Sequence, residues 1–125
     1  DETVLFVASR DDHTLSMIDA ATMKVTRTVA TGEDPTRLYL TRDGRLLVVN
    51  YGERSIRVFD PESLEALGRV DTVAKPIAVS FHPDGGLAYV ALNDNSVGVL
   101  DLATLTLRHG FAVGKEADGL AILAL

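Results

Sequence analysis

A period of 41 residues runs through the whole sequence and constrains the fold more than any other feature. Aspartates recur at this spacing, each after a short apolar run: Asp19, Asp60 and Asp101. Leucines and hydroxyl-bearing residues keep the same step, and the copies align without a gap. A period of about 40 residues is typical of folds built from stacked supersecondary units. The length of 125 residues suits one domain, made of three repeat units: 3–43, 44–84 and 85–125.

Each unit contains four short segments that are typical of β-strands, and we letter the strands A to D. No segment keeps a 3.6-residue apolar period, so no helix is expected. The A strands are predicted at 37–41, 77–81 and 119–123, the B strands at 5–8, 46–49 and 87–90, and the D strands at 25–29, 67–70 and 107–111. The C strands end at the repeated aspartates. The chain therefore runs in the order BCD-ABCD-ABCD-A.

The separators between these segments have turn chemistry. Asp43-Gly44 and Asp84-Gly85 provide a residue that tolerates positive φ, as a tight A–B hairpin requires. After each C strand, the repeated aspartate is expected to accept a nearby backbone N–H in a type I turn. A turn residue is needed in every unit, whereas a catalytic residue is needed once. The repeated aspartates are therefore interpreted as structural.

The apolar pattern of the strands predicts how the units pack. The A and B strands are apolar at nearly every position, as in residues 46–49, whereas a sheet with one wet face would alternate. The D strands are mixed, as in residues 25–29, which places one edge of each sheet in solvent. Four-stranded antiparallel sheets stacked face to face around an axis form a β-propeller. The predicted fold class is all-β, and the domain over residues 1–125 is a partial β-propeller.

The repeat also resembles a known family. A Thr or Ser, an apolar run and Asp, followed by a turn and by Pro35 or Pro76 before the next strand, is similar to the YVTN β-propeller repeat. The quartets that correspond to the family's signature are degenerate here: residues 6–9, 47–50 and 89–92, the third slipped by one residue. Lactonase-like and haem-d1-associated propellers are more distant relatives. The resemblance implies architecture, and rings of seven blades, more than it implies a function.

Three blades are too few to close a ring, because propellers usually have four to eight. The outer units are as apolar as the middle one, so a monomer would expose two blade faces. Two explanations are open. The chain is a piece of a larger propeller, or it forms a homo-oligomer in which the last A strand of one copy completes the first blade of another. A twofold dimer would give a six-bladed ring. An isolated monomer is not expected to be stable.

Composition excludes several classes of function. The net charge is −6 and the pI is about 4.9, which disfavours nucleic acid as a partner. The sequence has no cysteine, so disulfides, zinc–thiolate sites and cysteine nucleophiles are excluded. No apolar window is long enough for a membrane span. The lack of cysteine, together with the family resemblance, favours a periplasmic or extracellular location.

The loops between strands D and A and between strands B and C are expected to meet at one rim, where the sequence varies most between units. Variable loops on a rigid scaffold are the usual place for binding. Arg37 stands out because its equivalents are Ala78 and Gly119, and we expect it to point into the channel. The charges are mixed in sign, which favours a polar small molecule or a protein surface. The candidate ligand-binding residues are His13, Asp34, Arg37, Tyr51, Arg54, Lys75 and Asp118.

No catalytic residue, metal site or cofactor is predicted. The three histidines, His13, His82 and His109, occupy unrelated places in the repeat, whereas metal ligands must converge on one point. The rim carboxylates, which include Glu116, are expected to form salt bridges rather than an acid–base pair. The favoured function is a non-catalytic scaffold for protein or small-ligand binding. The alternative is a segment or subunit of a propeller enzyme, lactonase-like or haem-d1-related.

Overall fold

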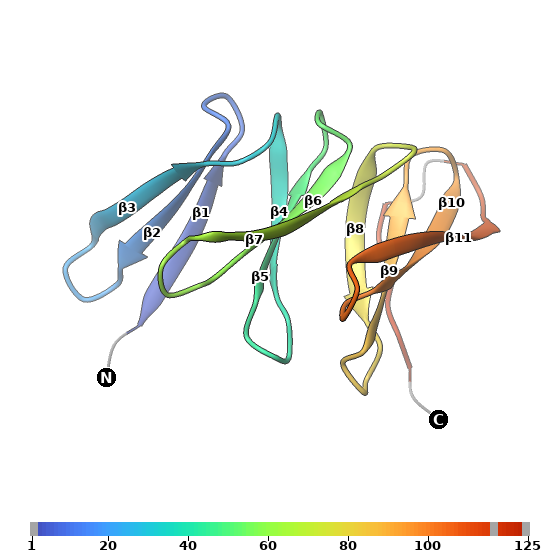
Figure 1. Ribbon diagram of the computed structural model, residues 1–125. Helices are drawn as coiled ribbons and strands as arrows, with labels where there is room; N and C mark the ends of the chain where they lie inside the picture. The colour runs from blue at the N-terminus through green and yellow to red at the C-terminus, as the bar shows by residue number, and fades with distance from the viewer. Residues whose placement is uncertain (1–2, 116–117, 124–125) are drawn as a thin grey trace.

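The computed structural model describes residues 3–115 and 118–123, and these ranges contain strands and turns but no helix. Eleven strands form three antiparallel sheets that stand side by side as blades (Figure 1). The first sheet contains β1 (Val4–Ser9), β2 (Thr14–Asp19) and β3 (Lys24–Ala30). The middle sheet contains β4 (Pro35–Leu40), β5 (Leu46–Asn50), β6 (Ser55–Phe59) and β7 (Ala66–Asp71). The third sheet contains β8 (Pro76–Phe81), β9 (Leu87–Leu92), β10 (Ser96–Asp101) and β11 (Thr106–Ala112).

This arrangement confirms the all-β fold class and the order of strands within the blades. In each complete sheet the strands follow chain order from one edge to the other, so β4 and β8 are the A strands and β7 and β11 the outer D strands. The first sheet begins with a B strand and has no A strand of its own. No helix long and apolar enough to cross a membrane is found in the described ranges.

The turns form as their residues predict. Asp60 Oδ1 accepts the backbone N–H groups of Glu62 and Ser63 at 2.8 and 3.1 Å, and Asp19 and Asp101 do the same in their blades. Gly44 and Gly85 have φ of 84° and 83° in the A–B hairpins, a conformation that L side chains rarely adopt. The repeated aspartates and glycines therefore have structural roles.

The apolar core lies between the sheets. All five residues of β5 are buried, as the unbroken apolar pattern of this strand predicts. One apolar cluster fills the space between the middle and third sheets, around Leu47, Val58 and Leu100. A second cluster joins the first and middle sheets, around Leu15, Leu46 and Phe59. The middle sheet is thus covered on both faces, and its neighbours each cover one of them.

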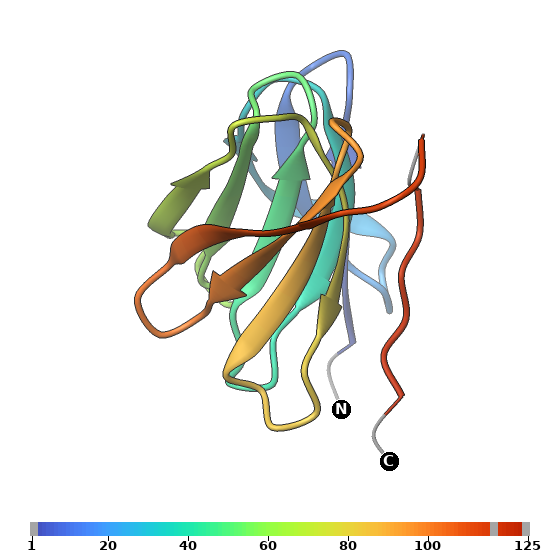
Figure 2. The ribbon, with the colours of Figure 1, turned by 90° about the vertical axis from the view of Figure 1, so that its right-hand side faces the viewer.

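Neighbouring A strands are also tied directly to one another. The Tyr39 hydroxyl on β4 accepts the N–H of Val79 on β8 at 3.1 Å. One blade further on, the Ser80 hydroxyl on β8 donates to the carbonyl of Leu120 at 2.8 Å. These two contacts occupy equivalent positions of the repeat. Residues 118–123 therefore lie beside β8 as β8 lies beside β4 (Figures 1 and 2).

The structure differs from the sequence-based expectation at two places. Residues 119–123, expected as a further A strand, form no strand, because no B strand lies beside them to complete a ladder. The second difference is a one-residue slip of β9. Leu46 pairs with Phe59 in the middle sheet, yet Ala88, and not Leu87, pairs with Leu100 in the third. Gly86 lengthens the preceding hairpin by one residue and the following B–C loop is one residue shorter, so the repeat is not free of gaps.

Candidate functional site

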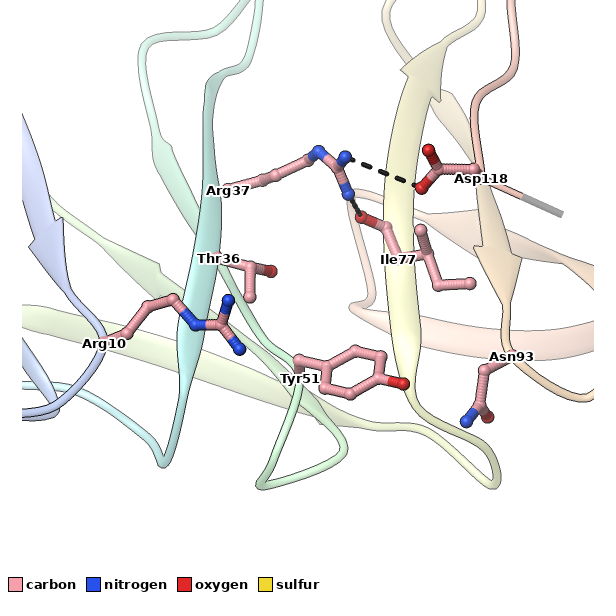
Figure 3. Close-up of a pocket in the computed structure, with 7 residues that line it drawn as sticks. All are labelled: Arg10, Thr36, Arg37, Tyr51, Ile77, Asn93 and Asp118. Atoms are coloured by element: carbon pink, nitrogen blue, oxygen red, sulfur yellow. Dashed lines mark hydrogen bonds and ion pairs between the residues drawn. The ribbon is translucent and has the colours of Figure 1, made fainter. Parts of the chain in front are cut away.

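A cavity of about 810 Å³ opens at the rim where the B–C and D–A loops meet (Figure 3). The A strands β4 and β8 form its floor, and residues from all three blades surround it. The lining residues are Arg10, Thr36, Arg37, Tyr51, Ile77, Asn93 and Asp118.

The lining consists largely of two sets of equivalent positions. Ser9, Asn50 and Leu92 end the three B strands, and each pairs with the first residue of its C strand. The residues that follow them are the first set: Arg10, Tyr51 and Asn93. Thr36 and Ile77, the second residues of β4 and β8, are followed at the same 41-residue step by Asp118, and these three are the second set. The repeat thus places side chains of different chemistry around one space.

Arg10 and Asp34 form a two-pronged ion pair that joins the first blade to the start of β4. Arg10 Nε lies 2.5 Å from Asp34 Oδ1, and Nη2 lies 3.0 Å from Oδ2. The hydrogen bond from Arg10 holds the pKa of Asp34 below its usual value. The backbone N–H of Asp34 donates to His13 Nδ1 at 3.1 Å, and φ of Asp34 is 56°. This carboxylate is held ionised and fixed in place.

Tyr51 and Lys75 occupy the same two positions one blade further along. Here the contact is between a cation and a ring, with Lys75 Nζ 4.8 Å from the centroid of Tyr51. The backbone N–H of Lys75 donates to Asn93 Oδ1, and the backbone N–H of Asn93 donates to the carbonyl of Lys75, both at 2.9 Å. Equivalent loops of successive blades are therefore joined by different contacts. The first pair of loops is joined by an ion pair and the next pair by a cation–π contact.

Arg37 extends from β4 across the cavity towards the next A strand (Figure 3). Its Nη1 donates to the carbonyl of Ile77 at 2.5 Å, and its Nη2 lies 3.7 Å from Asp118 Oδ1. Beside it, the hydroxyl oxygen of Thr36 is covered, and it has no hydrogen-bond partner in residues 3–115 and 118–123. The register of β4 against β5 shifts between Pro35 and Arg37, which makes Thr36 the irregular residue of this strand.

The seven residues proposed from the sequence fall into three groups. Arg37, Tyr51 and Asp118 line the cavity. Asp34 and Lys75 adjoin it through their contacts with Arg10 and Tyr51.

His13 and Arg54 belong to the B–C turns. Both have positive φ, as does the equivalent Asn95, and the carbonyls of all three accept a backbone N–H from the following D–A loop. Arg54 is exposed and is not part of the cavity lining.

Four lining residues, Arg10, Thr36, Ile77 and Asn93, were not among the proposed seven. Arg10 and Asn93 could have been found because they share a position with Tyr51, but the slip of β9 hides this relation for Asn93. Thr36 and Ile77 share the second position of the A strand with Asp118. Glu116, considered with the rim carboxylates, lies outside the described residues.

The two carboxylates at the cavity are not arranged as an acid–base pair. Asp34 and Asp118 face different arginines, and the pKa of Asp34 is lowered, whereas a general acid needs a raised one. In the part of the chain that the structure describes, no three His, Asp or Glu residues are placed to hold a metal ion. His82 lies at the opposite rim, and His109 lies on β11.

Antiparallel blades of three and four strands around a shared cavity define this chain as a segment of a β-propeller. The sequence model of the YNCE-like beta-propeller matches residues 2–123, and the chain belongs to this family. This assignment agrees with the resemblance to YVTN-type repeats seen in the sequence. A search of curated protein sequences finds no match.

Solved structures share the fold. Hydrazine synthase of Kuenenia stuttgartiensis superposes with a TM-score of 0.77 and 27% identity, over 89% of this chain and 34% of that one. The dihydro-heme d1 dehydrogenase NirN, solved in complex with DHE, also gives a TM-score of 0.77, at 13% identity, over 92% of this chain and 25% of that one. The chain thus spans about a third and a quarter of these two proteins.

Proposed function

We propose that the chain is a binding segment of a β-propeller, whose cavity takes up a polar small molecule or a polar group of a protein partner. The main support is that the cavity is lined by two sets of residues, each of which occupies equivalent positions of the repeat. Backbone positions that repeat from blade to blade present Arg, Tyr and Asn in one set and Thr, Ile and Asp in the other. Rigid strands that hold varied side chains around one concave space are the usual design of a ligand site.

The test is a fragment screen followed by ¹⁵N chemical-shift mapping on the full chain, in the assembly that it forms in solution. The screen includes neutral, cationic and anionic fragments and short polar peptides. Shifts from binders are expected to gather at Tyr51, Asn93 and Arg37. The hollow at the opposite rim, near Arg42 and His82, is the internal control. Binders that gather at the opposite rim, or a screen without binders, would contradict the proposed function.

A segment of a propeller enzyme is the second candidate. It is supported by the likeness to hydrazine synthase, at 27% identity. Further blades or a partner would then supply the reacting groups. Haem uptake would give visible absorption bands, and lactone turnover that is lost in Arg37→Ala would point to the cavity. Either result would replace the non-catalytic proposal.

We also propose that the open first sheet is completed by an A strand from elsewhere, either from a second copy or from the remaining blades of a larger propeller. Two features support this. β1 exposes Val4, Leu5 and Val7, although Leu46, the equivalent of Leu5, is 1% exposed. Residues 118–123 lie beside β8 without a strand partner of their own.

The two sources of this strand predict different masses in solution. Sedimentation of the 125-residue chain as a dimer would favour a six-bladed ring of two copies, and irregular association would favour missing blades. The variant Leu5→Ala tests whether another strand covers β1 in the assembly. If β1 is covered, this variant destabilises the assembly by nearly as much as Leu46→Ala, about 2–5 kcal/mol. A compact and stable monomer would contradict both forms of closure.

A further inference from the structure

We propose that the cavity binds a small molecule through an oxyanion, a carboxylate or a phosphate, held by Arg37 and Thr36 with the body of the ligand against Tyr51 and Ile77. This inference rests on the proposed function and names the class of ligand. It is drawn from the state of the cations around the cavity, from an unpartnered hydroxyl and from the balance of hydrogen-bond donors and acceptors.

Of the two arginines that line the cavity, Arg37 is the one whose charge is less satisfied. Arg10 is held by both oxygens of Asp34 at 2.5 and 3.0 Å, and Lys75 lies over the ring of Tyr51. Within residues 3–115 and 118–123, the one carboxylate paired with Arg37 is that of Asp118, and their separation of 3.7 Å is beyond hydrogen-bond distance. The side chain of Asp118 is 81% exposed. A guanidinium anchored at one nitrogen, with the others open to a cavity, is suited to two-pronged binding of a carboxylate or a phosphate.

Thr36 supplies a second donor next to Arg37. Its hydroxyl oxygen is covered and has no partner in the described ranges, although a covered polar atom without a partner costs free energy. Successive residues of a regular strand point to opposite faces, yet Thr36 and Arg37 both line the cavity. The register shift of β4 accounts for this, and such irregularities commonly re-aim side chains at binding sites.

The remaining lining is rich in donors and has apolar walls. Asn93 Oδ1 already accepts the N–H of Lys75, and the amide Nδ2 of Asn93 adds a donor to the lining. Among the lining residues that the structure describes, the carboxylate of Asp118 is the one charged acceptor. The Tyr51 ring and the Ile77 side chain supply apolar surface (Figure 3). A volume of about 810 Å³ exceeds that of a bare inorganic ion and suits an organic molecule.

A matched set of fragments tests the charge requirement: benzoate, phenyl phosphate, benzamide and benzylamine. Each is titrated into the full chain and followed by ¹⁵N chemical shifts. Benzoate and phenyl phosphate are expected to shift Thr36, Arg37 and Tyr51, and the stronger of the two identifies the oxyanion as planar or tetrahedral. Benzamide is expected to bind at least about tenfold more weakly, because it lacks the charge.

The fragment results separate this inference from the proposed function. If benzamide or benzylamine binds in the cavity as tightly as benzoate, the ligand does not need an oxyanion. This result would overturn the inference but not the proposed function. If none of the four fragments binds, the proposal of an oxyanion ligand is wrong. The broader screen of fragments and peptides then decides whether the cavity binds any ligand.

Three variants and one control test the residues, with the stronger of benzoate and phenyl phosphate as the probe. Arg37→Gln is expected to weaken binding by about tenfold or more, and Thr36→Val by about threefold. Asp118→Asn is expected to strengthen binding by about threefold, because it removes the carboxylate that competes for Arg37. Arg42→Gln is the control, since Arg42 also donates to a carbonyl of the next blade, that of Pro83 at 2.7 Å, but at the opposite rim.

The control and the aspartate variant guard against a merely structural explanation. Equal weakening by Arg42→Gln and Arg37→Gln would show that the bridge between blades, and not the charge in the cavity, supports binding. Weakened binding in Asp118→Asn would show that this carboxylate is part of the site rather than a competitor. Either result would overturn the proposal, even if Arg37→Gln proves too unstable to measure.

Discussion

The two rims of the blades use the same repeat in opposite ways. At the rim of the A–B and C–D turns, both backbone and side chains recur, as in the N–H groups that Asp19, Asp60 and Asp101 accept. At the cavity rim the backbone recurs without the side chains. His13, Arg54 and Asn95 share φ of 57°, 58° and 66° but differ in side-chain chemistry. Side chains that repeat therefore have a structural role in every blade, whereas the repeated backbone of the cavity rim leaves the side-chain chemistry free to vary.

One network at the cavity rim qualifies this contrast, because it is structural and only part of it repeats. Ser96 Oγ donates to Asp94 as Ser55 Oγ donates to Glu53, but Gly98 and Gly110 replace the two arginines of the network in the third blade. Glu53 accepts hydrogen bonds from Ser55 Oγ at 2.5 Å and from Arg57 Nε at 2.9 Å, and Arg69 Nη1 lies 3.4 Å away. The side chain of Glu53 is 19% exposed. The hydrogen bond from Arg57 is the largest cause that lowers the pKa of Glu53 to about 2.

Glu53→Gln should therefore have the largest effect on stability at either rim. Because the folded pKa lies below the unfolded value near 4.5, the carboxylate stabilises the fold above pH 4.5, and this stability is lost as the pH falls towards 2. The expected loss in Glu53→Gln at pH 7 is roughly 2–3 kcal/mol. Urea unfolding at a series of pH values measures it.

Glu65→Gln, an exposed change in the C–D turn of the same blade, is the matched control and should change little. The difference between the wild type and Glu53→Gln should shrink below pH 4.5. A difference that stays constant down to about pH 2 would show that Glu53 acts through packing rather than through its charge.

At the opposite rim, Gly44→Ala is the next largest change. Gly44 has φ of 84°, and a Cβ there would meet no atom within 4 Å, so the cost is purely conformational. A loss of about 1–2 kcal/mol is expected, because left-handed backbone is unfavourable for alanine. Asn tolerates this region better, so Gly44→Asn should recover part of the loss. Chemical denaturation of both variants measures the difference.

Gly114 at the cavity rim is the matched control for Gly44. It does not have positive φ, and a Cβ would also meet open space. Gly114→Ala should therefore change stability by no more than about 0.5 kcal/mol. If both variants lose the same stability, the positive φ of Gly44 is not the cause, and the proposed difference between the two rims is wrong.

The sequence alone predicts the fold well because each blade needs the same turns and the same apolar strands. The period, the aspartate turns and the positive φ of Gly44 and Gly85 all follow from residue types that have few alternatives. The one-residue slip of β9 cannot be predicted from the sequence. Gly86 adds a residue before β9 and the B–C loop after it is one residue shorter, so the 41-residue spacing is unchanged on either side.

The candidate site is less predictable, since it depends on which side chains of a loop turn inwards. Arg37 and Tyr51 are found because they depart from the repeat. His13 and Arg54 also depart from it, yet their backbone conformation explains them. Whether a varied position serves a turn or a cavity depends on the direction of the side chain, and the repeat does not encode that direction.

The smallest expected effect concerns the contact between Lys75 and Tyr51, which replaces the Arg10–Asp34 ion pair in the next blade. Tyr51 is half-buried, and a cation over a ring that is still open to solvent contributes about 0.5–1 kcal/mol. Lys75→Gln and Tyr51→Leu should each lower stability, and the double variant should lose less than the sum by about that amount. Urea unfolding of the wild type, the two single variants and the double variant completes this double-mutant cycle. Strictly additive losses would mean that the two side chains only lie near each other and do not help to fasten the middle blade to the third.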